Sequence, residues 1–436
     1  MHRPHQHLVR TRLANGLRVL LAPDRTVPVV AVAVHYDVGM RSEPEGRTGF
    51  AHLFEHLMFQ GSELLPKLDH AHHVQASGGV FNGSTHLDYT QYHNVLPSNA
   101  LERALFLESD RMRAPNLNAE NLRVQIDVVK EEIRVNVTNK PYGCFPWVTL
   151  PGVLFDSFAN SHDGYGSFDD LDSATVEDAR QFFDRYYAPA NALLTLCGDF
   201  DPDEALAMVE RHFGPIPFRP KPSRPDFAEP ELTGERRTVR YDPHAPLPAV
   251  AAGWRVPDPI GQWQEYLPYL LLADVMSDDG PACRLHRRLV RQDGLATSHR
   301  CYLGMLGDPL DTGHPTALVC SARQTPGTSS GQVLDAIAEE FALVAEHGPA
   351  ERELRRIATR LSTRLLVETD AVLARTQALA SLELRHGRAE LLGELPGLLT
   401  AVTAGQVAEA AARITPDRRA VVELLPASYR EKERAA

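Results

Sequence analysis

The chain has 436 residues, of which 43% are hydrophobic and 23% are charged, as is typical of a globular protein long enough for two domains. Its formal net charge is −12 and it has no block of basic residues, so the composition argues against a nucleic-acid partner and mildly favours a basic substrate. No run of about 18 uncharged apolar residues occurs, so no membrane span is predicted.

The N-terminus and the cysteines together indicate a cytoplasmic protein. Residues 1–7 lead directly into a strand-like segment and lack the apolar region of a signal peptide. The five cysteines are scattered and none forms a Cys-x-x-Cys pair, so we expect neither a disulfide framework nor a thiolate zinc site.

The first half of the chain alternates irregularly between strand and helix patterns. We expect an Asn15-Gly16 turn, a helix capped by Ser98 and a second helix capped by Asn118. Other predicted strands are 17–21, 29–38, 78–82, 88–95 and 192–197. Another helix is predicted at 175–187, and the segment 49–59 is compatible with a helix. This order predicts an α+β sandwich and not a doubly wound sheet.

A proline-rich segment divides the chain. Residues 214–230 contain six prolines, which exclude a continuous helix or an interior strand there. We therefore expect an N-terminal domain at 1–218, a linker at 219–230 and a C-terminal domain at 231–436. The second half again begins with strand patterns and a helix, and 349–386 is predicted to be a long helical region. Similar length and order therefore suggest that the two halves are a duplicated module.

The strongest chemical signal is the sequence His52-Leu53-Phe54-Glu55-His56 in an apolar, helix-compatible run. On a helix, His52 and His56 stand one turn apart on the same face and Glu55 lies on the adjoining stripe. Two neutral imidazoles and a base able to take a proton from water are what a catalytic zinc requires. The plainer interpretation is a pair of surface histidines in a chain that has 19. The second half has no such motif.

A catalytic zinc needs a third protein ligand. Val128-Val129-Lys130-Glu131-Glu132-Ile133, in a predicted helix, offers Glu131 and Glu132, and periodicity alone does not choose between them. Asp69-His70-Ala71-His72-His73 raises the question of a second metal site, but a solvated helix surface is the expected interpretation because no partner ligand is visible.

Over nearly its whole length the chain resembles pitrilysin-family peptidases, which include the insulinases and mitochondrial processing peptidase. The matching segments are Asn15–Val19, Val38–Arg41, Gly49–Gly61, Gly78-Gly79 with Asn82, Thr85 and Tyr92, Val128–Arg134, Ala174–Asp178 and Gly198–Phe200. The resemblance implies two homologous sandwich domains, each an antiparallel-rich sheet covered by helices, which together form one half of a clamshell.

The resemblance also assigns roles to residues. It implies one zinc ion per chain, held by His52, His56 and Glu132, with Glu55 as the catalytic base. It further implies an extended peptide pairing with segment 76–85, where Asn82 is the expected side-chain contact and an ordinary turn asparagine is the alternative. The family has a glutamate two helical turns before the third ligand, and here that position is Gln125, which lacks the charge.

One family feature is missing from the second half. Self-sufficient members resemble one another in a Leu-Arg-x-x-x-Gly-Leu-Ala-Tyr motif whose arginine and tyrosine reach the substrate. Aligned on Gly294-Leu295-Ala296, this chain has Val290 and Thr297 at those positions. The resemblance thus implies the zinc subunit of a heterodimer, whose homologous partner supplies the arginine and tyrosine. A self-sufficient homodimer using Arg291 or another group, and a non-catalytic structural subunit, are the alternatives. The expected substrates are short or unfolded peptides, leader peptides among them.

Overall fold

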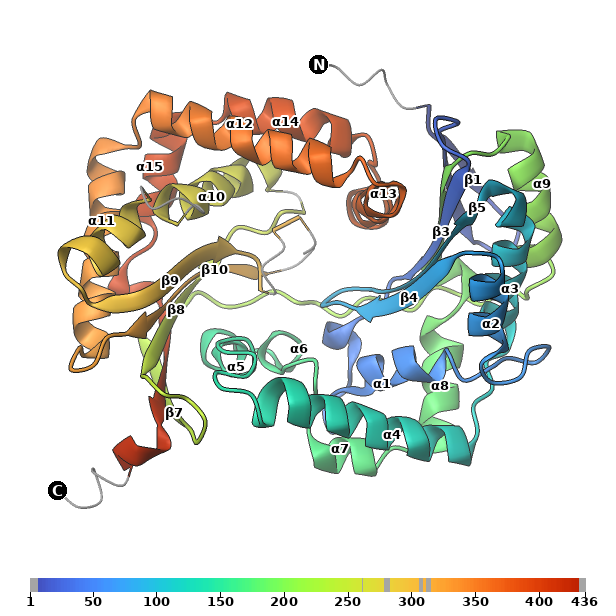
Figure 1. Ribbon diagram of the computed structural model, residues 1–436, viewed down its shortest axis with the longest axis horizontal. Helices are drawn as coiled ribbons and strands as arrows, with labels where there is room; N and C mark the ends of the chain where they lie inside the picture. Colours follow the sequence, from blue (N-terminus) through green and yellow to red (C-terminus); the bar gives the residue numbers. More distant parts are fainter. Residues whose placement is uncertain (1–6, 261, 278–282, 306–308, 311–314, 431–436) are drawn as a thin grey trace. The chain divides into compact units, whose positions relative to one another are not determined.

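The computed structural model describes residues 7–260, 262–277, 283–305, 309–310 and 315–430 (Figure 1). Residues 1–6, which we predicted to carry no signal peptide, lie outside the described residues. The chain forms two compact units, each assembled from three stretches of sequence. The first unit comprises Met1–Lys130, Gly164–Pro225 and Arg364–Glu394, and the second comprises Glu131–Asp163, Asp226–Thr363 and Leu395–Ala436.

The first unit contains a six-stranded sheet in the order β1-β2-β6-β3-β5-β4. Neighbouring strands are antiparallel except β2 and β6, which run parallel. The strands are β1 (Val9–Arg12), β2 (Arg18–Pro23), β3 (Val29–Tyr36), β4 (Val80–Thr85), β5 (Thr90–Pro97) and β6 (Ala192–Gly198). The predicted turn between β1 and β2 is confirmed: Gly16 has a φ of 87°, and the Asn15 amide donates to the carbonyl oxygens of Phe213 and Ile216.

Helices cover both faces of this sheet. The helices of the first unit are α1 (Phe50–Leu57), α2 (Asp69–Ala76), α3 (Leu101–Arg113), most of α4 (Ala119–Ile133), α7 (Phe168–Asp172), α8 (Val176–Tyr186), α9 (Pro202–Phe213) and α13 (Val372–His386). Helix α13 comes from the second half of the chain and packs on β3 and β6. Its Leu379 and Ala380 join Leu20, Leu193 and Cys197 in a buried apolar cluster, which is what holds this helix against the sheet.

The second unit contains a five-stranded sheet in the order β7-β11-β8-β10-β9. Its strands are β7 (Arg236–Asp242), β8 (Ala249–Val256), β9 (Ala296–Leu303), β10 (Thr316–Gln324) and β11 (Ala420–Pro426). Here too one pair, β7 with β11, is parallel and the other neighbours are antiparallel. This sequence of pairings is that of β2-β6-β3-β5-β4 in the first unit, and it agrees with the predicted duplication.

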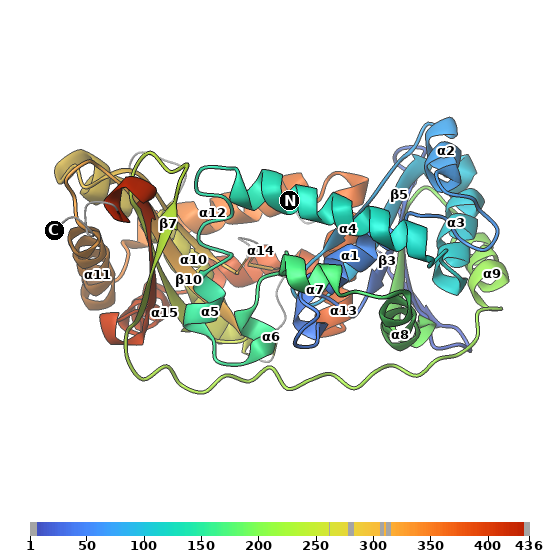
Figure 2. The same ribbon diagram turned by 90° about the horizontal axis from the view of Figure 1, so that it is seen from below.

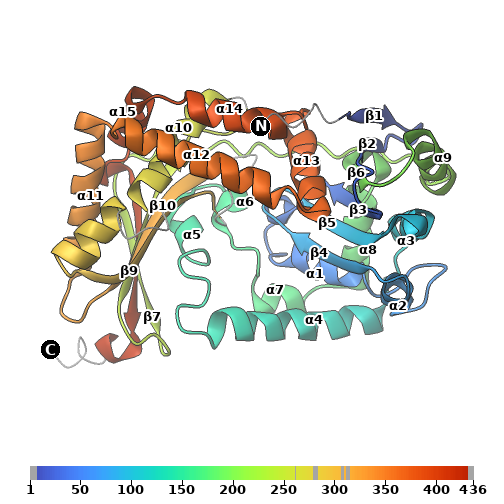
Figure 3. The same cartoon turned by 45° about the horizontal axis from the view of Figure 1, so that its top comes forward.

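Helices also cover both faces of the second sheet. The larger ones are α10 (Trp263–Met276), α11 (Ser330–His347), most of α12 (Glu351–Glu368), α14 (Leu391–Ala401) and α15 (Ala404–Ala412), with α15 packing on α10 and α11 (Figure 3). Consecutive residues of β8 show the two faces: Gly253 lies against Leu150 of the short helix α5 (Leu150–Leu154), and Trp254 packs on Phe341 of α11. The α+β class with two helix-covered sheets is therefore confirmed.

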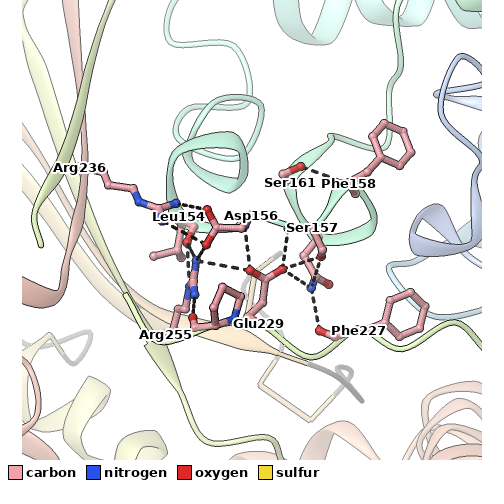
Figure 4. Close-up of polar contacts among 11 residues, drawn as sticks. Leu154, Asp156, Ser157, Phe158, Ser161, Phe227, Glu229, Arg236 and Arg255 are labelled. Carbon is pink, nitrogen blue, oxygen red and sulfur yellow. Dashed lines mark hydrogen bonds and ion pairs between the residues drawn. The ribbon is translucent and has the colours of Figure 1, made fainter. Parts of the chain in front are cut away.

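The proline-rich segment 214–230 is extended and forms no helix or strand (Figure 2). Its end is fixed by Glu229, whose carboxylate accepts hydrogen bonds from the backbone amides of Asp156 and Ser157 and from the amide of Asn160 (Figure 4). Arg255 of β8 completes the cluster, with its guanidinium 3.4 Å from Glu229 and 3.0 Å from Asp156. The cluster joins the linker, β8 and the loop between α5 and α6 (Phe158–Ser161) within the second unit.

One detail of the predicted helices was wrong. Ser98 does not cap α3, which begins at Leu101 after a short 3₁₀ turn; its hydroxyl instead donates to Asp199. Region 349–386 is helical as predicted, but it contains two helices, because α12 ends at Glu368 and α13 begins at Val372 after an extended Ala371. The break is required because α13 packs on the first sheet, whereas α12 belongs largely to the second unit.

Within the described ranges, no single helix is both long and apolar enough to cross a bilayer. Helices α14 and α15 together have such a length and composition, but they are bent by 88° at the break between them.

Candidate metal centre

The start of helix α1 is held by close backbone contacts. Gly49, with a φ of 80°, precedes the helix, and the buried Glu43 carboxylate accepts hydrogen bonds from the amides of Gly49 (2.9 Å) and Ala51 (2.7 Å). A Cβ atom at Gly49 would lie 2.4 Å from the carbonyl oxygen of Tyr165, so no larger residue fits without a shift. A carboxylate at a helix N-terminus also interacts favourably with the positive end of the helix dipole. The first turn of α1 is thereby fixed in position.

Helix α1 buries one face and presents the two histidines on the other. Phe50, Leu53, Phe54 and Leu57 are buried, as expected for the apolar stripe of a core-facing helix. His52 and His56 are only half-buried, and their ring centroids are 4.9 Å apart with an interplanar angle of 84°.

The electrostatics favour a neutral His52. Burial, together with the neighbouring His56, lowers the pKa of His52 to about 4. An imidazole that is neutral at physiological pH has a nitrogen lone pair available to a metal.

Helix α4 brings a carboxylate to the histidines. The boundary between the two compact units falls between Lys130 and Glu131, inside this continuous helix, so less than one turn separates Glu132 from the part of α4 that belongs to the first unit. One ligand atom each from His52, His56 and Glu132 lies within 4.8 Å of the others. It is the single such group of metal-ligating side chains found among the described residues.

The structure distinguishes Glu131 from Glu132, which helical periodicity alone could not do. Glu131 is exposed and accepts a hydrogen bond from Arg134 at 3.1 Å, whereas Glu132 joins the histidines. The donor set of two imidazole nitrogens and one carboxylate oxygen is that of known catalytic zinc sites. Tetrahedral zinc places neighbouring ligand atoms about 3.4 Å apart, so a group spread over at most 4.8 Å fits the ion after small side-chain rotations.

Glu55 lies beside this group without belonging to it. Its Oε2 accepts a hydrogen bond of 2.7 Å from the hydroxyl of Thr85, at the end of β4. The carboxylate is also close enough to the buried Tyr92 and Tyr187 to contribute, after the larger effect of burial, to their raised pKa values. Sequence reasoning gave Thr85 no role. Strand β4 packs on α1 (Figure 3), and the bond of Thr85 to Glu55 is one of the contacts between them.

The other predicted residues lie on the same elements. Gln125 is buried on α4, two turns before Glu132 and on the same face of the helix. Asn82 is exposed on β4, which is the last strand in the sheet order and so has an unpaired edge (Figure 1). The Asn82 side chain accepts a hydrogen bond from the amide of Gly83.

The histidines at 70–73 do not form a second metal group within the part of the chain that the structure describes. His72 is exposed, which agrees with the predicted solvated helix surface. His70 is instead buried, and its Nε2 is hydrogen-bonded to Oδ1 of Asn94 at 3.2 Å. Burial lowers the pKa of His70 to about 4. His70 is thus part of the packing of α2 on the sheet.

The positions where the resemblance expects an arginine and a tyrosine lie in the second unit. Val290 is in the π-helix His286–Gln292 and Thr297 is near the start of β9, which is an edge strand. Thr297 is exposed, and its hydroxyl donates to the carbonyl oxygen of Arg323 at 3.3 Å. Strand β9 holds the place in the second sheet that β4 holds in the first.

The fold and the donor set define the class of this protein: an α+β protein of two similar sheets that carries a His-x-x-Glu-His helix and a distal glutamate. Comparison with known families agrees. Residues 18–144 match the model of insulinase, peptidase family M16, and residues 173–361 match the model described as the peptidase M16 inactive domain. The chain belongs to peptidase family M16.

Individual relatives are named zinc proteases. A protein of Helicobacter pylori named zinc protease PqqE is 30% identical over 256 residues, which are 56% of this chain and 56% of that protein. An uncharacterized zinc protease of Mycobacterium leprae, ML0855, is 28% identical over 79% of this chain and 75% of its own length. The crystal structure of a protease from Helicobacter pylori has a TM-score of 0.88 at 23% identity and covers 97% of this chain and 100% of that one, which establishes the likeness of fold.

Proposed function

We propose that this protein is a zinc-dependent peptidase that hydrolyses short or unfolded peptides. The observation that carries the proposal is the convergence of His52, His56 and Glu132 within 4.8 Å, with Glu55 beside them on α1. The zinc-protease names of its relatives agree with this donor set.

Each residue has a distinct part in the proposed reaction. His52, His56 and Glu132 would hold one zinc ion. When bound, the ion supplies Lewis acidity, which brings the pKa of a water molecule to about 7 and polarises the scissile carbonyl. Glu55 takes the proton from the attacking water and delivers it to the leaving amine, a role that suits a carboxylate beside the ligand set and outside it. Gln125 would lie behind Glu132 and affect its orientation by hydrogen bonding alone, since it has no charge.

The proposed peptide-binding element is strand β4. An extended peptide can add to an edge strand by main-chain hydrogen bonds, and β4 has an unpaired edge and contacts α1. Asn82, exposed on that strand, is the proposed side-chain contact.

We further propose that the chain acts as the zinc subunit of a heterodimer. The Val290 side chain has no hydrogen-bond donor. The Thr297 side chain is shorter than that of a tyrosine, and its hydroxyl donates to the carbonyl oxygen of Arg323. A homologous partner with an arginine and a tyrosine at these positions would complete the site. A homodimer that uses Arg291 or another group is the competing arrangement.

A second candidate function is that of a non-catalytic structural subunit. The description of residues 173–361 as an inactive domain type favours it. However, the chain brings His52, His56 and Glu132 together in its first half, with Glu55 beside them, so we favour the catalytic function.

The test uses the purified chain, a library of quenched fluorescent peptides and a chelator. The proposal predicts cleavage that 1,10-phenanthroline abolishes and zinc restores, either by the chain alone or after addition of a homologous subunit that carries the arginine and tyrosine. Strong cleavage by the chain alone would exclude the heterodimer. A chain that binds one zinc ion and cleaves no peptide, even with such a subunit, would favour the structural function.

A further inference from the structure

We infer that Thr85, the last residue of the strand proposed to bind the peptide, is a positioning residue for the base Glu55. The inference rests on the proposed function and adds a residue to it. Its basis is one contact, the 2.7 Å hydrogen bond from the Thr85 hydroxyl to Glu55 Oε2.

The geometry shows which acceptor the hydroxyl prefers. A threonine hydroxyl has a single proton to donate, and the two acceptors near it are Glu55 Oε2 at 2.7 Å and the carbonyl oxygen of Ala51 at 3.5 Å. The shorter distance is typical of a hydroxyl that donates to a charged carboxylate, which is among the stronger hydrogen bonds in proteins. The proton therefore belongs to the bond with Glu55.

This bond limits the arrangements that the Glu55 side chain can adopt. A glutamate has three side-chain torsions, and holding it in one arrangement costs conformational entropy. Thr85 is β-branched, so its own χ1 is stiff, and it lies in a strand whose register pairs it with Thr90 of β5. A rigid donor thus restricts the position of one carboxylate oxygen of the base.

The rest of the hairpin supports Thr85. Two residues earlier on the same face, Gly83 is so close to Phe59 and Tyr92 that a Cβ atom there would lie 3.1 Å from each ring. Beyond Thr85, the turn is held by the buried ion pair of Arg41 with Asp88 at 3.2 Å. Because Asn82 is three residues before Thr85, the same strand would contact the peptide and orient the base.

Three variants test the inference. Thr85→Val keeps the β-branched shape and removes the hydroxyl, Thr85→Ser keeps the hydroxyl, and Thr195→Val removes a buried hydroxyl from β6 of the same sheet. We expect Thr85→Val to bind one zinc ion with unchanged KM but to lower kcat about tenfold or more, since small misplacements of catalytic groups cost one to two orders of magnitude. Thr85→Ser is expected to recover most of the loss, and Thr195→Val to match the wild type.

A readout independent of activity accompanies the kinetics. In crystal structures of the wild type and of Thr85→Val, the Glu55 carboxylate is expected in one position in the first and displaced or in several rotamers in the second. An unmoved Glu55 in Thr85→Val, or a kcat within twofold of the wild type, would overturn the inference. Absence of zinc-dependent cleavage by the wild type would instead reject the proposed function, while the two crystal structures would still decide what holds Glu55.

Discussion

Arg385 Nη1 lies 3.8 Å from Asp88 Oδ2, and both side chains are completely buried in the first unit. Asp88 follows strand β4 and also pairs with Arg41, whereas Arg385 is on α13, from the second half of the chain. The hairpin that carries Asn82 and Thr85 is therefore braced by a residue almost 300 positions further along the sequence. No local sequence pattern predicts such a contact.

Breaking this buried pair should be costly. We expect Arg385→Met to lower the free energy of unfolding by about 1–3 kcal/mol, which is less than the cost of an unpaired buried charge because Asp88 keeps its pair with Arg41. Arg123→Met is the matched control, since Arg123 forms an exposed pair with Asp127 at 3.7 Å and should cost less than about 1 kcal/mol. Urea denaturation followed by circular dichroism measures both, and equal losses would refute the bracing role.

The adjacent glutamates of α4 provide an internal comparison. Glu132→Gln should weaken zinc binding by at least about tenfold, whereas Glu131→Gln should leave it unchanged, because Glu131 pairs with Arg134 on the helix surface. Competition with a fluorescent chelator measures the two affinities. If Glu131→Gln were the more damaging change, the assignment of the third ligand would be wrong.

Substitution of the base and substitution of a zinc ligand should have different effects on metal content. Glu55→Gln is expected to retain one zinc ion and to lose peptide cleavage by at least about a hundredfold, since an amide cannot accept the proton from water. His52→Ala should lose both the metal and the activity. Metal content by mass spectrometry and cleavage of a quenched peptide are measured on the same samples, and a fully active Glu55→Gln protein would reject the mechanism.

Stability should fall in acid partly because of His70. Its pKa is lowered by burial from 6.5 to about 4, so the unfolded chain binds a proton at a pH where the folded chain does not. The free energy of unfolding therefore includes the full contribution of His70 above pH 6.5. It falls by roughly 3 kcal/mol as the pH is lowered from 6.5 to about 4. His70→Gln should flatten the stability–pH curve over this interval, and His72→Gln, exposed on the same helix, should not. Urea midpoints from pH 7.5 to pH 4.5 provide the comparison, and parallel curves for His70→Gln and the wild type would contradict it.

The missing arginine and tyrosine can be restored. If the heterodimer proposal is right, the chain alone cleaves peptides weakly, and Val290→Arg with Thr297→Tyr raises that activity, because the groups that steady the substrate then come from a chain of the same kind. Val290→Met with Thr297→Val controls for bulk without new hydrogen-bond donors. Steady-state kinetics of the three proteins decide the matter, and a double variant no more active than its control would count against the role of these positions.

Local sequence patterns were sufficient wherever local physics governs. The Asn15-Gly16 turn and the Asn118 cap, whose side chain accepts from the amide of Asn121, follow from short-range hydrogen bonding. The helix at 175–187 is present as α8, with a capping box between Thr175 and Asp178. Strand 29–38 and the histidine helix were likewise found within a few residues of their predicted ends.

The failures have a common physical cause, which is contact between segments distant in sequence. The break after Glu368 depends on α13 packing on the first sheet. Ser98 does not cap the helix, and its hydroxyl donates to Asp199, about 100 residues further along the chain. The choice of Glu132 over Glu131 depended on a family resemblance, since both have the same helical propensity. Thr85 was missed as a partner of Glu55 because 30 residues separate a strand end from a helix face.

The central claim is that His52, His56 and Glu132 together hold one zinc ion. Anomalous diffraction at the zinc absorption edge, from crystals of the protein purified without chelators, tests it most directly. The account predicts one strong peak per chain, about 2 Å from an imidazole nitrogen of each histidine and from a carboxylate oxygen of Glu132. A peak elsewhere, or none at these residues after soaking with zinc, would contradict it.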